Sequence, residues 1–245
     1  MKICTVEFIQ DKKKDPFPIL SKIFHNSFRK HHGSNHEIHH IRIPFTKNWR
    51  DIYPFPKKGN KGFVFNNLKL KYWVNFLKTK CTMGDNVVLS DLDMMFRSSI
   101  DSAFIDDFNI GLTQSNLQSL PINAGVVFVK VSPEAIKFFE KWNEIDNVFF
   151  FEDQDLHFKY LLRFGGMNQA SLGYTLENFS NSAIIKYLPS KEWNCYGADL
   201  PKSLTENSPK IIHLKDNLRR VPRKIDLKTP DIKKQIYQEM SYYAN

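Results

Sequence analysis

Two carboxylates, Asp91 and Asp93, follow a short apolar run in the segment NVVLSDLDMMF, residues 86–96. In extended backbone the side chains of residues i and i+2 point to the same side, so both carboxylates can bind one hard cation while Leu92 points away. Mg²⁺ and Mn²⁺ prefer such oxygen ligands and often share them with phosphate groups. The alternative is a pair of solvated acids in a turn. The apolar run favours a strand end, where α/β sheets bind ligands, and therefore a metal site.

The rest of the chain predicts strands that alternate with helices. Apolar alternation or short apolar runs indicate strands over residues 3–9, 37–43, 87–90, 108–113, 122–131, 184–188 and 210–214. Helical spacing indicates helices over residues 16–29, 66–80, 133–145, 152–164 and 231–243. Ser132 is the expected N-cap of the third helix, and Gly165-Gly166 should end the fourth. This alternation predicts an α/β fold, one domain with a mostly parallel central sheet flanked by helices.

The composition is that of a folded, basic protein. Of the 245 residues, 42% are hydrophobic, which is enough for one sizeable core. Lys and Arg (35) exceed Asp and Glu (26), and the net charge of +9 favours anionic partners such as phosphate groups, nucleic acid or an anionic membrane surface. No nucleic-acid motif accompanies this charge, so we expect no nucleic-acid partner.

The cellular setting is suggested by what the sequence lacks. The three cysteines form neither a disulfide framework nor a zinc motif, which favours a reducing compartment. The N-terminus resembles no secretory signal, and no apolar segment reaches the roughly 20 residues of a membrane helix. We therefore expect a cytoplasmic protein, with any membrane association peripheral.

Two enzyme classes place an Asp-x-Asp motif after an apolar strand. In phosphatases that form a phospho-aspartate the first Asp, here Asp91, is the nucleophile. Those enzymes normally continue with Gly-Thr near the start of their fold, whereas Met94-Met95 follows here. A basic protein that binds nucleic acid or membrane surfaces is a further alternative, supported by charge alone.

The second enzyme class fits more of the chain. Four segments together resemble nucleotide-sugar glycosyltransferases of the GT-A fold, most closely family 8 and its relatives: VVLSDLDMMF, PINAGVVFVK (residues 121–130), FEDQDLHFKYL (151–161) and KIIHLK (210–215), in the order of that family. The resemblance implies metal-dependent transfer of a sugar from a nucleoside-diphosphate sugar, most simply a UDP-sugar, to a hydroxyl of a glycan, glycolipid or glycoprotein.

The same resemblance implies one GT-A-like, Rossmann-related domain over residues 1–245. Its nucleotide-binding half would be residues 1–113, its acceptor and catalytic half residues 114–215, and its basic C-terminal segment and helix residues 216–245. Acceptor specificity is expected in residues 44–62 and 114–120. The basic C-terminal segment is also the expected place of any peripheral membrane contact.

The resemblance assigns the metal to three residues. Asp91, Asp93 and His213 would bind Mn²⁺ or Mg²⁺, with Asp93 a direct ligand and Asp91 shared between the metal and the ribose. The metal would bridge the two phosphates and neutralise the charge of the departing nucleoside diphosphate. A lone histidine in an apolar strand is more often a core residue, so His213 is singled out only by its place in the motif order.

Further positions follow for the donor. Thr5 and Val6 would contact the nucleobase, Lys71 and Lys215 the diphosphate, and Asn123 the donor sugar or the acceptor. For Asn123 the alternative is a strand in which the following glycine marks a bulge. Lys215 departs from the family pattern, which has a glycine between the His and the Lys. The alternative cations, which could also meet lipid headgroups or solvent, are Arg219, Arg220 and Arg223.

The Asp-Gln-Asp element supplies the expected catalytic residues. Asp153 would contact sugar hydroxyls, Gln154 would lie near the anomeric carbon, and Asp155 would support them. This element implies retention of the anomeric configuration. In an inverting enzyme Glu152, Asp153 or Asp155 would instead act as the base on the acceptor hydroxyl. The structural alternative is that these acids stabilise a helix N-terminus, by roughly 0.3–1 kcal/mol each.

Overall fold

The computed structural model describes residues 1–9, 16–45, 61–115, 120–197, 199–206, 208–219 and 231–245. A six-stranded sheet of order β2-β1-β3-β6-β5-β7 forms its centre. The strands of this sheet are β1 (Lys2–Ile9), β2 (Glu37–Pro44), β3 (Asn86–Ser90), β5 (Ile110–Gln114), β6 (Ile122–Lys130) and β7 (Ile185–Pro189). A separate two-stranded sheet consists of β4 (Met94–Phe96) and β8 (Ile211–His213).

Helices connect most of these strands. The α-helices are α1 (Phe17–His32), α3 (Lys61–Lys80), α4 (Pro133–Phe151), α5 (Gln154–Phe164), α6 (Met167–Phe179), α7 (Ser190–Trp193), α8 (Asp199–Glu206) and α9 (Asp231–Ala244). Short 3₁₀ helices are η1 (Asp101–Phe104), η2 (Ser180–Ser182) and η3 (Asp216–Arg219). Each α-helix in the described part of the chain is too short or too polar to span a bilayer.

The sheet confirms the expected α/β fold. β1 pairs in parallel with β2 and β3, and β5 pairs in parallel with β7. Only β6 runs against its neighbours β3 and β5, so the sheet is mostly parallel. The carboxyl ends of β1 and β3 therefore lie at the same edge of the sheet, and Asp91 follows β3 directly at that edge.

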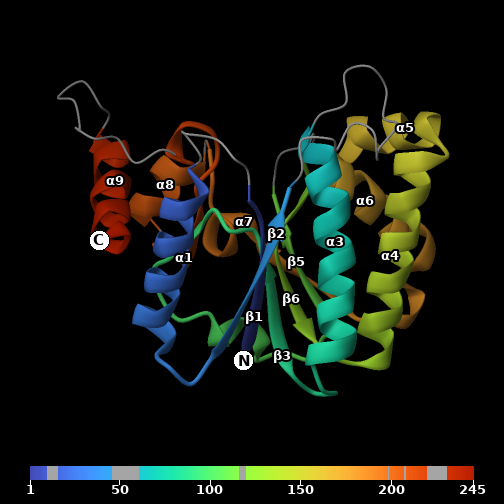
Figure 1. Ribbon diagram of the computed structural model, residues 1–245, viewed down its shortest axis with the longest axis horizontal. Helices are drawn as coiled ribbons and strands as arrows, with labels where there is room; N and C mark the ends of the chain where they lie inside the picture. Colours follow the sequence, from blue (N-terminus) through green and yellow to red (C-terminus); the bar gives the residue numbers. More distant parts are fainter. Residues whose placement is uncertain (10–15, 46–60, 116–119, 198, 207, 220–230) are drawn as a thin grey trace.

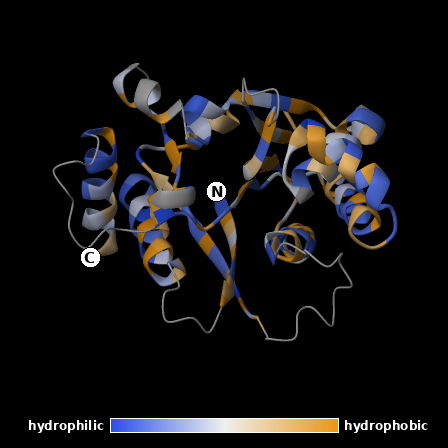
Figure 2. Ribbon diagram, turned by 90° about the horizontal axis from the view of Figure 1, so that it is seen from above, coloured by the Kyte–Doolittle hydropathy of each residue, from blue (hydrophilic) through white to orange (hydrophobic). Residues whose placement is uncertain are grey.

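Helices cover both faces of the sheet, as Figures 1 and 2 show from two directions, and a hydrophobic cluster lies on each face. Alternation along β1 sends Cys4, Val6 and Phe8 into the cluster under α3 and α4, where Trp73 and Trp142 are fully buried. Ile3 points to the opposite face, into the cluster that α1 completes with Phe24 and Phe28. The two clusters hold the strand ends in fixed positions relative to each other.

Several helices differ from their predicted bounds. α4 begins after Ser132, whose side chain accepts a hydrogen bond from the Ala135 N–H as expected, but it continues to Phe151 because Phe149 and Phe150 are buried. α3 starts at Lys61, five residues before the predicted start. α6 was not predicted, since its polar sequence lacks a clear apolar stripe. Its Gly173 is needed for close packing, because a Cβ there would collide with the Phe164 ring.

A buried acid, Asp146, connects the helices on one side of the sheet. Asn67 of α3 and Ser171 of α6 donate hydrogen bonds to its two carboxylate oxygens. Burial nevertheless raises the pKa of Asp146 from 3.8 to about 6. Because the unfolded chain ionises this group at lower pH than the folded protein, the stability that it contributes is complete below pH 3.8 and is lost as the pH rises through 6.

We expect Asp146→Asn to gain stability relative to the wild type as the pH rises from 4 to 7, by up to roughly 3 kcal/mol for a shift of about two units. An amide side chain keeps both hydrogen-bond partners but carries no buried charge. The difference in melting temperature between the two proteins, measured against pH, tests this. Asp107→Asn removes an exposed carboxylate and controls for charge alone. A difference that is constant with pH would contradict the prediction.

Candidate active site

The register of β4 and β8 brings His213 to the two acids. β3 ends at Ser90, Leu92 is buried, and β4 begins at Met94, which pairs with His213 in the antiparallel ladder. The ladder continues as the Leu214 N–H donates to the Asp93 carbonyl oxygen at 2.7 Å. A strand far along the chain thus places an imidazole opposite both carboxylates.

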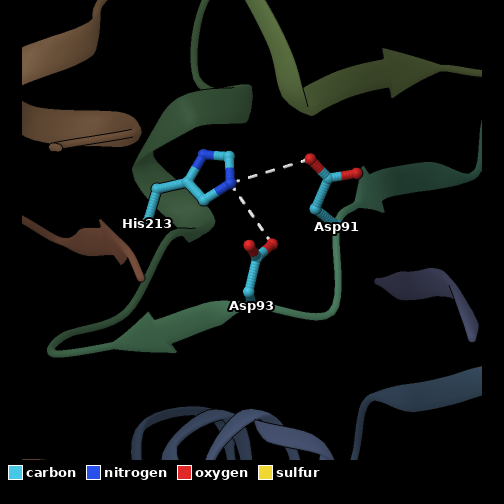
Figure 3. A group of neighbouring side chains, drawn as sticks. All are labelled: Asp91, Asp93 and His213. Atoms are coloured by element: carbon cyan, nitrogen blue, oxygen red, sulfur yellow. Dashed lines mark ion pairs between the residues drawn. The ribbon is translucent and has the colours of Figure 1, made fainter. Parts of the chain in front are cut away.

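The three side chains converge on one point (Figure 3). His213 Nε2 lies 3.2 Å from Asp93 Oδ1 and 3.7 Å from Asp91 Oδ2. The other carboxylate oxygens are held by cations: Lys69 Nζ donates to Asp91 Oδ1 at 2.5 Å, and Arg219 Nε donates to Asp93 Oδ2 at 2.8 Å. Each acid therefore binds one cationic side chain and turns its second oxygen toward His213.

This group has the composition of a divalent metal site. Within the described residues, Asp91, Asp93 and His213 form the one group of three or more His, Cys, Asp or Glu whose ligand atoms all lie within 4.8 Å of one another. Ligands about 2.1 Å from one ion at right angles are about 3 Å apart, and His213 Nε2 lies 3.2 and 3.7 Å from the two carboxylate oxygens. The two carboxylates suit Mn²⁺ and Mg²⁺, and the imidazole is a common ligand of first-row transition metals, so the residues fit a divalent ion and favour Mn²⁺ of the two.

Protonation states also favour metal binding. Burial raises the pKa of Asp93, but His213 and the Arg219 guanidinium outweigh it, so the pKa lies well below its usual range. Burial lowers the pKa of His213 more than Asp93 raises it, which favours the neutral imidazole that a metal requires. When the imidazole is neutral, the Arg219 guanidinium, which is always charged, still keeps the pKa of Asp93 low, so Asp93 stays ionised.

Gly125 of β6 makes room for the imidazole. A Cβ at this position would lie 2.6 Å from His213 Cε1 and 2.9 Å from Nδ1, closer than side-chain atoms approach. The Gly125 carbonyl oxygen also accepts a hydrogen bond from the Asp91 N–H at 2.8 Å. The pairing of β5 with β6 shifts register between Leu112 and Thr113, so an irregularity lies near Asn123 as well.

Other residues predicted for the donor lie near this group. Thr5 pairs with Ser90, the residue before Asp91, and its buried hydroxyl has no hydrogen-bond partner among the described residues. Val6 is buried and points into the core under α3. Asn123 is buried, and its Oδ1 accepts from the Gly125 N–H at 2.9 Å. Its Nδ2 has no partner in the described part of the chain, so it can donate to a ligand.

One lysine of the site was not predicted. α3 brings Lys69 to Asp91, whereas Lys71, which was predicted to contact the diphosphate, lies about 200° further around the helix and is exposed. Lys69 also lies over the Trp73 ring, 4.6 Å from its centroid, and this spacing of four was the signal available in the sequence. Lys215 lies near the acids and covers the Tyr196 ring at 4.1 Å. Burial lowers its pKa, while Asp91 and Asp93 raise it.

The Asp-Gln-Asp element lies at the start of α5. Asp153 is the N-cap, and its Oδ1 accepts from the Leu156 N–H at 2.9 Å. Gln154 and Asp155 begin the helix, and all three side chains are exposed. α5 lies toward the end of the sheet at which β1 finishes (Figure 1). Asp153 therefore stabilises a helix N-terminus, which was the structural alternative to a catalytic role. The roles of the three residues toward a sugar stay predictions.

Parts of the expected site lie outside the described residues. These are residues 46–60 and 116–119 of the two expected acceptor segments and residues 220–230 of the basic segment, including Arg220 and Arg223. Arg219 is described and binds Asp93. Sequence reasoning did not single out Asn194, whose Oδ1 lies 2.9 Å from His213 Nδ1.

Most of the chain matches a known protein family. The family of nucleotide-diphospho-sugar transferases matches residues 58–225. No curated protein sequence matches the chain significantly.

Solved structures resemble the whole fold. One is a glycosyltransferase involved in glycosylation of the major capsid of PBCV-1, with a TM-score of 0.58 and 11% identity over 98% of this chain and 100% of that one. The glycosyltransferase GlyE of Streptococcus pneumoniae TIGR4 gives 0.55 and 12%, over 100% of this chain and 62% of that one. Mouse xyloside xylosyltransferase 1 gives 0.52 and 12%, over 91% and 100%. At such identities the likeness shows the fold.

Proposed function

The chain belongs to the nucleotide-diphospho-sugar transferase family and is a glycosyltransferase, and from this premise we propose that it transfers a sugar from a UDP-sugar to a hydroxyl of a glycan, glycolipid or glycoprotein with the help of a divalent metal. The observation that carries the proposal is the convergence of Asp91, Asp93 and His213 within 4.8 Å, at a strand end between cationic side chains.

In this proposal Asp91, Asp93 and His213 hold Mn²⁺ or Mg²⁺. A bound ion would neutralise negative charge on the diphosphate as it leaves. Support comes from the ligand types and from the orientation of the carboxylates, since each keeps one oxygen turned toward His213 Nε2 while a cation holds the other. Those cations also limit the rotation of the carboxylates, which prepares the site for its ligand.

Cationic side chains would bind the diphosphate itself. Lys69 and Arg219 contact the two acids, and Lys215 lies close enough to interact electrostatically with both carboxylates. Charge-assisted hydrogen bonds from such groups to phosphate oxygens are stronger than neutral ones and stabilise a leaving diphosphate. Thr5 and Val6, on β1 beside this group, are the proposed contacts of the uracil base.

Contacts to the transferred sugar complete the proposal. Asn123 would donate through its Nδ2 to a sugar or acceptor hydroxyl, and Asp153 would accept from sugar hydroxyls. Gln154 would lie near the anomeric carbon, with Asp155 supporting both. This arrangement corresponds to retention of configuration. An inverting reaction would need a carboxylate base on the acceptor hydroxyl, and Glu152, Asp153 or Asp155 would supply it.

A thermal-shift panel of nucleoside diphosphates, with and without Mn²⁺, tests this function. We expect UDP to raise the melting temperature only when Mn²⁺ is present, by roughly 5–10 °C at about 100 times its dissociation constant. Metal without nucleotide and nucleotide with EDTA are the controls. If no nucleotide shifted the melting temperature under any condition, the proposed function would be wrong.

A further inference from the structure

Asn194 is a fully buried amide that packs against the imidazole of His213. It caps the short helix α7, where its N–H donates to the Ser190 carbonyl oxygen at 2.9 Å. The next residue, Cys195, bridges to β8: its N–H donates to Ile211 and its carbonyl oxygen accepts from the His213 N–H at 2.8 Å. The backbone therefore fixes Asn194 beside His213.

The hydrogen-bond network determines which end of the amide faces His213. The Thr113 hydroxyl donates to the Asn123 carbonyl oxygen at 2.7 Å, so it can only accept from Asn194. Asn194 Nδ2 supplies that bond at 2.9 Å and also lies 3.4 Å from the same carbonyl oxygen. Asn194 Oδ1 must then face His213 Nδ1, and an acceptor at that position requires a proton on Nδ1.

The two sides of the imidazole ring favour opposite tautomers. Asp93 Oδ1, 3.2 Å from Nε2, would favour a proton on Nε2, and in that tautomer Nε2 has no lone pair to bind a metal. Asn194 favours the proton on Nδ1, which leaves the Nε2 lone pair directed at the two carboxylates. Gly125 packs closely against the imidazole ring, and this contact hinders rotation of the ring to another orientation.

We propose that Asn194 is a positioning residue, which selects the tautomer and orientation in which His213 binds the metal, with Thr113 orienting the amide. The inference rests on the metal role proposed above. Partners of this kind on the far nitrogen of a histidine ligand typically change metal affinity by about 10- to 100-fold when removed.

Three variants separate positioning from simple packing. Asn194→Leu keeps the shape of the side chain and removes the acceptor. Asn194→Asp keeps an acceptor for the Nδ1 proton. Thr113→Val keeps Asn194 Oδ1 but removes the hydroxyl that holds Nδ2. The two measurements are Mn²⁺ affinity from the EPR signal of the free ion, and the His213 tautomer from ¹⁵N NMR of the metal-free protein, with thermal melting to confirm folding.

We expect Asn194→Leu to weaken Mn²⁺ binding by about 10- to 100-fold and to move the metal-free imidazole toward the Nε2-protonated tautomer. Asn194→Asp should restore the Nδ1-protonated tautomer and most of the affinity, and Thr113→Val should lie between the wild type and Asn194→Leu. A folded Asn194→Leu protein with wild-type affinity and tautomer would overturn the inference, as would an Asp variant as weak as the Leu variant. If the wild type bound no Mn²⁺, the metal role would fail, and the tautomers of the metal-free proteins would still decide the role of Asn194.

Discussion

Asp93→Ala should lose metal binding and donor turnover together. The substitution removes the carboxylate oxygen nearest to His213 Nε2, together with the oxygen that Arg219 binds. We expect the turnover number for donor hydrolysis to fall by a factor on the order of 10²–10³, the typical cost of removing one group that stabilises developing charge. Release of UDP from a panel of UDP-sugars, measured against Mn²⁺ concentration, checks this expectation.

Two controls make the Asp93 result specific. Asp93→Asn preserves shape and tests whether charge or volume matters, and EDTA should reduce the wild type to the level of the variants. Arg219 is nearly half exposed, so losing its partner should leave a folded protein. Full activity of the wild type in EDTA would exclude the metal role. Release of phosphate from a phosphomonoester, with activity dependent on Asp91, would instead favour the phosphatase alternative.

Gly125→Ala should displace His213 and abolish metal binding, although the added group is a single methyl. Its Cβ would lie 2.6 Å from His213 Cε1 on a strand that cannot move away, because the Gly125 carbonyl oxygen holds the Asp91 N–H and both strands are central in the sheet. Overpacking of this kind costs about 1–3 kcal/mol of stability. We expect the Mn²⁺ affinity, measured by EPR, to fall much more than the folding stability does when both are expressed as free energies.

Gly111→Ala is the matched control for overpacking. A Cβ at Gly111, on the neighbouring strand β5, would meet Phe128 Cβ at 3.1 Å and a carbon of the Phe108 ring at 3.3 Å. This variant should also lose stability, but it should bind Mn²⁺ as the wild type does, because the added methyl meets only hydrophobic side chains of the core, Phe128, Phe108 and Leu188. If both substitutions lowered the Mn²⁺ affinity equally, the loss would come from overpacking in general and not from displacement of His213 by the Cβ at residue 125.

The fold was predicted from the alternation of strands and helices, whereas the grouping of the two acids with His213 was predicted from the order of the motifs. The alternation of strands with helices was enough for the α/β class. The reversed direction of β6 was not predictable, since an apolar run has no direction. His213 was found only through motif order, and its structural cause is the pairing of Met94 with His213.

Residues that act through long-range contacts were harder to find. Lys69 was not named, because which lysine of α3 faces Asp91 depends on the helical phase relative to the sheet, and tertiary packing sets that phase. Asn194 carries no local signal at all, since it caps α7 and its partners His213, Thr113 and Asn123 come from three different strands. α6 was missed because Asp146, Trp142 and Gly173 stabilise it through packing and buried hydrogen bonds.

The β4–β8 ladder has a consequence for how the protein acquires activity during synthesis. Asp91 and Asp93 emerge from the ribosome more than a hundred residues before His213. A nascent chain can therefore complete β1, β3 and β6 and still lack the third ligand. A slip of one residue in the ladder would turn His213 to the opposite side. Under the proposed function, a chain that lacks β8 or pairs it in the wrong register would bind nucleotide weakly, so the chain could transfer a sugar only after β8 pairs with β4.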